Sequence, residues 1–148
     1  MGAYEDLIAY ERQTQALGQV AGRLGWDQET VMPRGAAPQR AEEAQAMEQV
    51  LHHRRTHPRV GAWLAQVNEG ALDSTGRAMM RHIRRRFDRT RLVPAELAGE
   101  LARVTSEAQG QWAEARAAED WPAFRPVLEK IVALKRTEAE ALVGNGGY

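Results

Sequence analysis

Apolar residues recur at intervals of three and four along the whole chain, and no segment shows the strict alternation that is typical of a half-buried β-strand. Alanine, with 25 residues, and glutamate, with 15, are both strong helix formers. The sequence therefore predicts an all-α fold. The clearest apolar stripe consists of Leu97, Leu101, Val104, Ala108, Trp112 and Ala115.

Prolines and glycines divide this pattern into about six helices. Pro33 disfavours helical geometry at the residue before it, and Pro94 suits the start of a new helix. Asp73 or Ser74 can cap the fourth helix. The predicted helices cover about residues 4–30, 38–56 and 59–67, and three more begin near residues 74, 94 and 121.

Each helix is expected to bury one apolar face. For the first helix this face is Tyr4, Leu7, Ile8, Leu17, Val20, Ala21 and Leu24. For the fourth helix it is Met79, Met80, Ile83 and Phe87, and for the sixth it is Phe124, Val127, Leu128, Ile131, Leu134 and Leu142.

The chain has 148 residues, a length that suits a single helical domain over residues 1–148. It contains no cysteine, which excludes disulfides, thiolate zinc sites and a cysteine nucleophile. No apolar run reaches the roughly 18 residues that a membrane span needs, and the N-terminus lacks a signal-peptide pattern. These observations predict a cytoplasmic protein without a membrane partner.

The 20 basic and 20 acidic residues cancel, but they are unevenly distributed. Residues 1–50 carry −4, residues 51–91 carry +7 and residues 92–148 carry −3. One alternative is therefore a standalone helical module that binds nucleic acid or an acidic partner through residues 51–91. Because only Trp63 and Phe87 offer aromatic rings there, arginines that are solvated or paired with the acidic outer segments explain the charge better, and we expect no nucleic-acid partner.

His53 and His57 are four residues apart, the spacing by which a helix presents two imidazoles to one metal ion. In a HEXXH motif the residue after the first histidine is a glutamate, but here it is Arg54, and no adjacent carboxylate supplies a third ligand. The other candidates are two serines without a G-x-S-x-G motif and three acidic residues whose spacing does not identify a catalytic pair. They are Ser74, Ser106, Glu114, Glu119 and Asp120. We predict that this chain contains no catalytic residue and no metal ligand.

Residues 24–40, with the sequence LGWDQETVMPRGAAPQR, form the most informative segment. They predict a helix end, a proline turn and a new helix start, in which Gly35 permits the turn and the Trp26 ring packs on its neighbours. Asp27 can cap the second helix or pair with Arg40. We expect a partly buried Asp27–Arg40 ion pair, and the alternative is a surface turn with no further role.

With these residues the chain resembles the N-terminal portion of the thermostable carboxypeptidase (carboxypeptidase Taq) family of HEXXH zinc metallopeptidases. The family's early signature of W-D-Q, M-P, G and R is matched by Trp26, Asp27, Gln28, Met32, Pro33, Gly35 and Arg40. Similarity continues in residues 51–52, 56–61, 93–97, 112–116 and 121–124, so it spans nearly the whole chain. One departure is His57, where the family often has Asp.

The resemblance implies a mostly helical enzyme with a long groove, which removes residues one at a time from peptide C-termini. In this family two HEXXH histidines and a downstream glutamate hold zinc or another divalent metal, and the HEXXH glutamate activates water. Family members are several hundred residues longer than this chain, and those motifs follow the region that it covers. The resemblance therefore implies an N-terminal, non-catalytic segment that is inactive alone and forms a wall or lid of the groove, with residues 32–35 near its edge.

The parent enzyme is expected to act on peptides in the cytoplasm and to form a homodimer, as is common in the family. The glycine-rich residues 144–147 predict an exposed loop at which a longer protein has been cut. A third alternative is a self-associating bundle, because a segment removed from a larger enzyme exposes apolar surface.

Overall fold

The structure is a computed structural model that describes residues 2–144, so the predicted loop after Gly144 lies outside the described residues. Its α-helices are α1 (Ala3–Thr30), α2 (Ala37–Arg55), α3 (Pro58–Gln66), α4 (Ser74–Leu92), α5 (Ala95–Ala117) and α6 (Trp121–Val143). Two 3-10 turns, η1 (Arg34–Ala36) and η2 (Glu69–Ala71), lie between them. No strand occurs in residues 2–144, and the predictions of an all-α fold and six helices are confirmed.

Polar side chains satisfy the free backbone N–H groups at several helix starts. Asp73 accepts a hydrogen bond from the Gly76 N–H at 2.7 Å, and Asp120 accepts one from the Ala123 N–H at 3.0 Å. Pro94 is the residue before the first turn of α5. Each helix therefore begins within one residue of the position predicted from the sequence.

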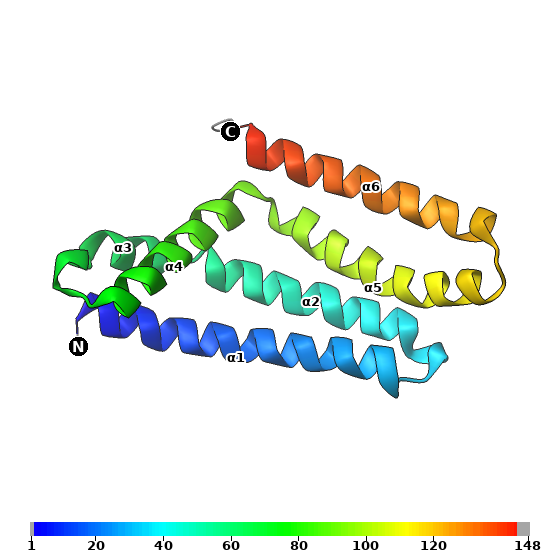
Figure 1. The fold of residues 1–148 in the computed structure, drawn as a ribbon, viewed down its shortest axis with the longest axis horizontal. Helices are drawn as coiled ribbons and strands as arrows, with labels where there is room; N and C mark the ends of the chain where they lie inside the picture. Colours follow the sequence, from blue (N-terminus) through cyan, green and yellow to red (C-terminus); the bar gives the residue numbers. More distant parts are fainter. Residues whose placement is uncertain (1, 145–148) are drawn as a thin grey trace.

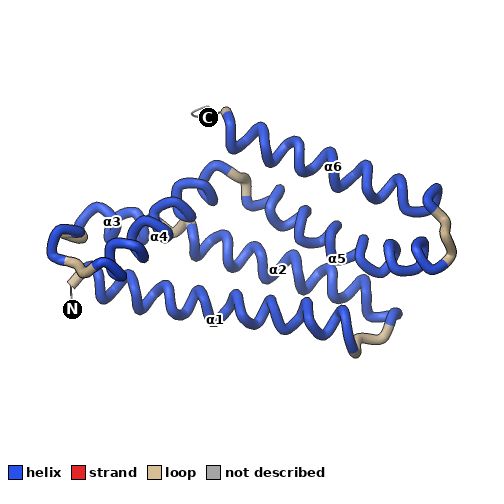
Figure 2. The backbone as a smooth tube through the Cα atoms, in the orientation of Figure 1, coloured by secondary structure: helices blue, strands red, loops and turns tan. Residues whose placement is uncertain are grey.

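Four long helices, α1, α2, α5 and α6, follow one another across the molecule (Figure 1). Contacts join α1 to α2, α2 to α5 and α5 to α6, and the tube view gives the same order (Figure 2). The short helix α3 and the helix α4 lie at the end of the array where α1 begins (Figure 1). The opposite end carries the α1–α2 turn and the α5–α6 turn.

The main apolar cluster lies where α1, α3 and α4 meet, and its buried members are Leu7, Val60, Leu64, Met80, Ile83 and Phe87. A second row of buried residues joins α2 to α5, namely Ala41, Leu51, Leu101, Val104 and Ala108. Burial of these side chains stabilises the fold by about 25 cal/mol for each Å² of apolar surface removed from water. The expected inner face of α4 is thus confirmed, except that Met79 is partly exposed.

Burial decreases toward the turn between α5 and α6, which differs from the prediction. The predicted stripe of α5 is buried from Leu101 to Ala108, but the Trp112 side chain is half exposed. The predicted inner face of α6 is only partly covered, and α6 has no buried residue. The reason is that α6 contacts mainly α5, so no second layer of described residues closes over it.

No helix in the described part of the chain is long and apolar enough to cross a membrane.

Candidate functional site

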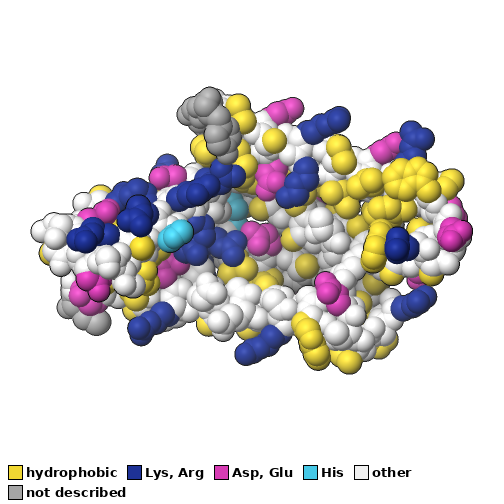
Figure 3. Space-filling model, viewed as in Figure 1, with side chains coloured by type: hydrophobic (Ala, Val, Ile, Leu, Met, Phe, Trp, Pro, Cys, Tyr) yellow, Lys and Arg dark blue, Asp and Glu magenta, His cyan; other side chains and the backbone are white. Residues whose placement is uncertain are grey.

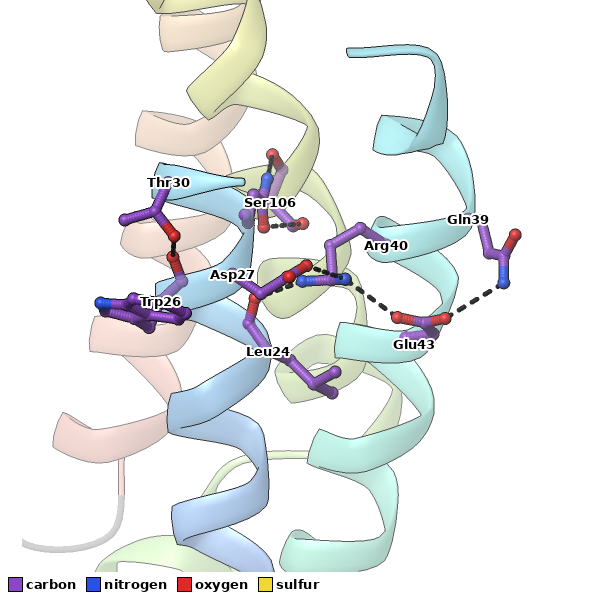
Figure 4. Close-up of polar contacts among 9 residues, drawn as sticks. Leu24, Trp26, Asp27, Thr30, Gln39, Arg40, Glu43 and Ser106 are labelled. Carbon is purple, nitrogen blue, oxygen red and sulfur yellow. Dashed lines mark hydrogen bonds and ion pairs between the residues drawn. The ribbon is translucent and has the colours of Figure 1, made fainter. Parts of the chain in front are cut away.

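The predicted ion pair between Asp27 and Arg40 is present at the α1–α2 turn (Figure 4). Arg40 Nη2 donates to Asp27 Oδ2 at 2.6 Å, and the Arg40 side chain is only 12% exposed. Other guanidinium nitrogens donate to the Leu24 carbonyl oxygen and to Glu43 Oε2. The hydrogen bond to Asp27 is the main reason why the pKa of Arg40 is raised above its usual value.

Gln28 joins α1 to α5 through two hydrogen bonds to Ser106, which is labelled in Figure 4. Its Nε2 donates to the Ser106 backbone carbonyl at 2.8 Å, and Ser106 Oγ donates to Gln28 Oε1 at 3.0 Å. This link was not predicted from the sequence, because the two residues are 78 positions apart and glutamine is common on helix surfaces. Asp27, Gln28 and Arg40 are therefore signature residues with contacts inside this chain.

The Trp26 ring points away from the ion pair, and the residue is 64% exposed, so the expectation that its ring packs on neighbouring residues is wrong (Figure 4). It lies on the outer face of the last turns of α1, where no other described helix covers it. Pro33 and Gly35 are also exposed, while Met32 is partly covered. A Cβ on Gly35 would meet open space, and its φ lies outside the left-handed region, so the turn does not require glycine there.

Two hollows meet at Trp112 near the same end of the helical array. One, of about 480 Å³, is lined mainly by Trp112, Trp121, Phe124 and Arg116. The other, of about 800 Å³, extends from Trp112 to the α1–α2 turn, where Met32 is among its lining residues. We call the two together the end groove. Space filling shows hydrophobic side chains gathered toward this end (Figure 3).

The end groove has aromatic walls and a few charged groups. The Trp112 and Trp121 side chains are 50% and 56% exposed. The guanidinium carbon of Arg116 lies 5.9 Å from the centre of the Trp112 ring. Across the other hollow, Arg34 and Glu114 form an exposed ion pair at 3.6 Å. Aromatic rings beside charged groups are typical of a surface that contacts another polypeptide.

A family profile described as "Carboxypeptidase Taq (M32) metallopeptidase" matches residues 6–148 of this sequence. The chain belongs to this family. The recognition made from the residue 24–40 signature is therefore confirmed.

Named relatives agree with the assignment to the carboxypeptidase Taq family. Thermostable carboxypeptidase 1 of Thermus thermophilus is 37% identical over 144 residues, which are 95% of this chain and 28% of that protein. Thermostable carboxypeptidase 1 of Pyrococcus furiosus is 30% identical over 140 residues, which are 93% of this chain and 28% of that protein. This chain thus spans less than a third of the length of the curated relatives that it matches.

Solved structures show the same helical arrangement. The apo-Mg structure of Pyrococcus furiosus carboxypeptidase matches with a TM-score of 0.73 and 29% sequence identity. The match covers 100% of this chain and 29% of the Pyrococcus furiosus chain. The crystal structure of BsuCP matches with a TM-score of 0.91 over 99% of this chain and 29% of the BsuCP chain. Because the sequence identity is 17%, this match supports the fold alone.

The family is described as a metallopeptidase family, and a metal site requires several ligating side chains close together. Within residues 2–144 no group of three His, Asp or Glu side chains is placed to hold one ion. The His53 and His57 rings are 5.7 Å apart, but His57 Nδ1 accepts the Arg59 N–H at 3.2 Å and so caps α3. The described residues therefore do not fit the metal that the family implies.

The remaining catalytic candidates have separate structural contacts. Asp120 caps α6, Glu114 lies beside Arg34, and Ser106 bonds to Gln28. Glu119 has a φ of 54°, a left-handed conformation at the α5–α6 turn. Ser74 is the first residue of α4. These positions supply no nucleophile with an adjacent base in the described part of this family member.

Two arginines of the basic region pair with acids of the acidic N-terminal segment, one of the two arrangements that the sequence predicted in place of a nucleic-acid surface. Arg86 forms an ion pair with Glu11 of the acidic N-terminal segment. Arg55 lies 3.3 Å from Glu48, whose pKa is raised chiefly by burial. These contacts neutralise part of the +7 charge within this carboxypeptidase-family chain.

Proposed function

We propose that this chain is the N-terminal, non-catalytic helical segment of a metallocarboxypeptidase, and that its end groove contacts the remainder of the enzyme at the wall or lid of the substrate groove. The observation that carries the proposal is the exposure of Trp112 and Trp121 in the end groove and of Trp26 in the last turns of α1. An apolar patch of this kind marks an interaction surface. The family relatives supply the length of polypeptide that would cover it.

The signature residues fall into two groups, those with contacts inside this segment and those that are exposed, and this division supports a contact with the rest of the enzyme. Asp27, Gln28 and Arg40 fix the helices of this segment, while Trp26 and Gly35 are exposed and have no evident role among the described residues. Residues of the second kind serve contacts outside the segment. Residues 32–35 would then form part of the groove edge.

For the parent enzyme we propose peptide substrates, zinc or another divalent metal held outside this segment, a homodimeric assembly and a cytoplasmic location. We further propose that neither nucleic acid nor a membrane is a partner of this segment. Peptide substrates and the divalent metal follow from the family. Arg86 pairs with Glu11 and Arg55 pairs with Glu48, so these two charges are not free to bind phosphates. This pairing supports the proposal that nucleic acid is not a partner.

The test is a peptidase assay on the purified 148-residue chain after incubation with zinc, with thermostable carboxypeptidase 1 of Thermus thermophilus as positive control. We expect no release of C-terminal amino acids from this chain. The reading frame that follows residue 148 should encode a HEXXH motif. Release of C-terminal residues that a chelator abolishes would show that this segment is catalytic and would overturn the proposal.

The contact role is tested in the full-length parent by Trp112→Ala together with Trp121→Ala. Because both rings are only about half covered here, the double variant should lower the free energy of unfolding of the isolated segment less than that of the parent. In the parent it should destabilise the protein or raise the KM for peptides. An unchanged parent would contradict the proposed contact.

A further inference from the structure

The outer face of α4 is rich in arginine. The helix has 19 residues, of which seven are arginine and one, Asp88, is acidic. Its inner face is formed by Gly76, Met80, Ile83 and Phe87, which are buried. Space filling shows several basic side chains over α4, and others are spread along the rest of the molecule (Figure 3).

Contacts within the chain engage some of these arginines but leave a row exposed. Arg84 lies 2.7 Å from Glu69, and Arg86 pairs with Glu11. The exposed Arg77, Arg81 and Arg85 are spaced four residues apart, so they share one side of the helix, and of the three Arg77 donates to the Leu72 carbonyl oxygen at 2.6 Å. Among the described residues, Arg81 and Arg85 have no ion-pair partner.

The geometry of this row indicates the kind of partner that it fits. A helix rises about 1.5 Å per residue, so successive guanidinium groups start about 6 Å apart along α4. Carboxylates placed every four residues on another helix have the same spacing. Arginine forms paired hydrogen bonds with carboxylates, which makes such an alignment specific as well as attractive.

We propose that Arg77, Arg81 and Arg85 on α4 bind an acidic helical segment of another protein, one whose carboxylates repeat every four residues. The inference goes beyond the metallocarboxypeptidase role, because it concerns the end of the molecule opposite to the end groove. Among the described residues, few aromatic rings are placed beside the row to stack on nucleic-acid bases, although the Tyr4 hydroxyl reaches Met79 of α4 at 3.9 Å. Phe87 is buried, and the Trp63 ring packs on Tyr10 with the ring centres 5.6 Å apart.

The test uses a fluorescent synthetic helix of about 20 residues with glutamate at every fourth position, titrated with the 148-residue chain at about 50 mM and about 200 mM salt. A peptide of the same composition with clustered glutamates is the spacing control. We expect the regular peptide to bind more tightly than the clustered one and to weaken as salt rises. Equal binding of the two peptides, or no binding at low salt, would overturn the proposal.

The decisive variant is Arg81→Glu with Arg85→Glu, and Arg125→Glu with Arg136→Glu on α6 makes the same change of charge elsewhere. We expect the α4 variant to lose about tenfold or more in affinity and the α6 variant to lose less than about twofold. Circular dichroism checks that each variant keeps its helical content.

Equal losses of affinity in both variants would show that binding depends on overall charge and not on the α4 row. Tighter binding of a single-stranded oligonucleotide than of the peptide would assign the row to nucleic acid, and either result refutes the proposal.

Discussion

Arg40 donates a 2.6 Å hydrogen bond to the carboxylate of Asp27 and thereby joins the second helix to the last turns of the first. The same guanidinium also reaches the Leu24 carbonyl oxygen, so it satisfies a backbone acceptor and a side-chain acceptor of α1. Since the Arg40 side chain is 12% exposed, its charge is partly withdrawn from water and depends on these partners. The ion pair therefore fixes the position of the start of α2 relative to the end of α1.

Removing either partner of this ion pair should destabilise the chain. We expect Arg40→Met to lower the free energy of unfolding by about 2–3 kcal/mol, because it leaves the Asp27 carboxylate without its donor and removes the added hydrogen bond to the Leu24 carbonyl oxygen. Asp27→Asn should cost less, about 1 kcal/mol, since Glu43 and Leu24 still accept from Arg40. Urea unfolding followed by circular dichroism measures both.

Arg125→Met is the matched control, because Arg125 and Glu129 form an exposed pair at 2.7 Å within α6. Its loss should change the free energy of unfolding by about 0.5 kcal/mol or less. If Arg40→Met had no more effect than Arg125→Met, the α1–α2 ion pair would not stabilise the fold.

The Gln28–Ser106 link should contribute independently to the attachment of α1 to α5. Gln28→Ala removes both hydrogen bonds and should cost about 1–2 kcal/mol, while Ser106→Ala removes only the bond to Gln28 Oε1 and should cost about 1 kcal/mol. The unfolding midpoint in urea reports each loss. Gln39→Ala, which removes an exposed contact with Glu43 on the same helix, serves as the control. Equal effects of Gln28→Ala and Gln39→Ala would show that the link is not structural.

The stability of the chain should depend on acid pH through Glu100. Hydrogen bonds from Arg103, and then from Lys130 of α6, lower the pKa of Glu100 from 4.5 to about 2. A carboxyl group whose folded pKa is depressed stabilises the protein above its unfolded pKa, and this contribution is lost as the pH falls toward the folded pKa. The contribution of Glu100 should therefore be complete above about pH 5.5 and decline between about pH 4.5 and pH 2.

Glu100→Gln tests this dependence. Because the Glu100 side chain is 30% exposed, solvent screening limits the expected loss at pH 7 to about 1 kcal/mol. The difference from the wild-type chain should shrink as the pH falls below 4.5. Glu129→Gln, at a more exposed pair, should show little difference at any pH. Parallel stability curves for the wild type and Glu100→Gln down to pH 2.5 would contradict the assignment.

The sequence predicted helix positions well because their signals are local. The spacing of Leu101, Val104 and Ala108 identified the buried side of α5, and Asp73 and Pro94 marked helix starts. The Asp27–Arg40 pair was also predictable, since a short turn leaves few positions for two opposite charges on adjacent helix ends.

Other features depend on tertiary contacts that periodicity does not encode. A stripe that includes Trp112 gives the direction of an apolar face, but it does not tell whether another layer covers that face. The exposure of Trp26 has the same origin. The Gln28–Ser106 bonds depend on how α1 and α5 pack across α2, which no local signal specifies.

Two glycines at helical positions should respond in opposite ways to a methyl group. A Cβ on Gly61 of α3 would lie 3.0 Å and 3.3 Å from carbons of the Phe87 ring, and Phe87 is buried on α4. Gly61→Ala should therefore lower the free energy of unfolding by about 1–2 kcal/mol, because the clash outweighs the gain in helix propensity. At Gly18 of α1 a Cβ meets open space, so Gly18→Ala should stabilise the chain by about 0.5–1 kcal/mol. Urea unfolding of the two variants provides the comparison, and equal stabilisation by both would show that α3 and α4 are not in the close contact described here.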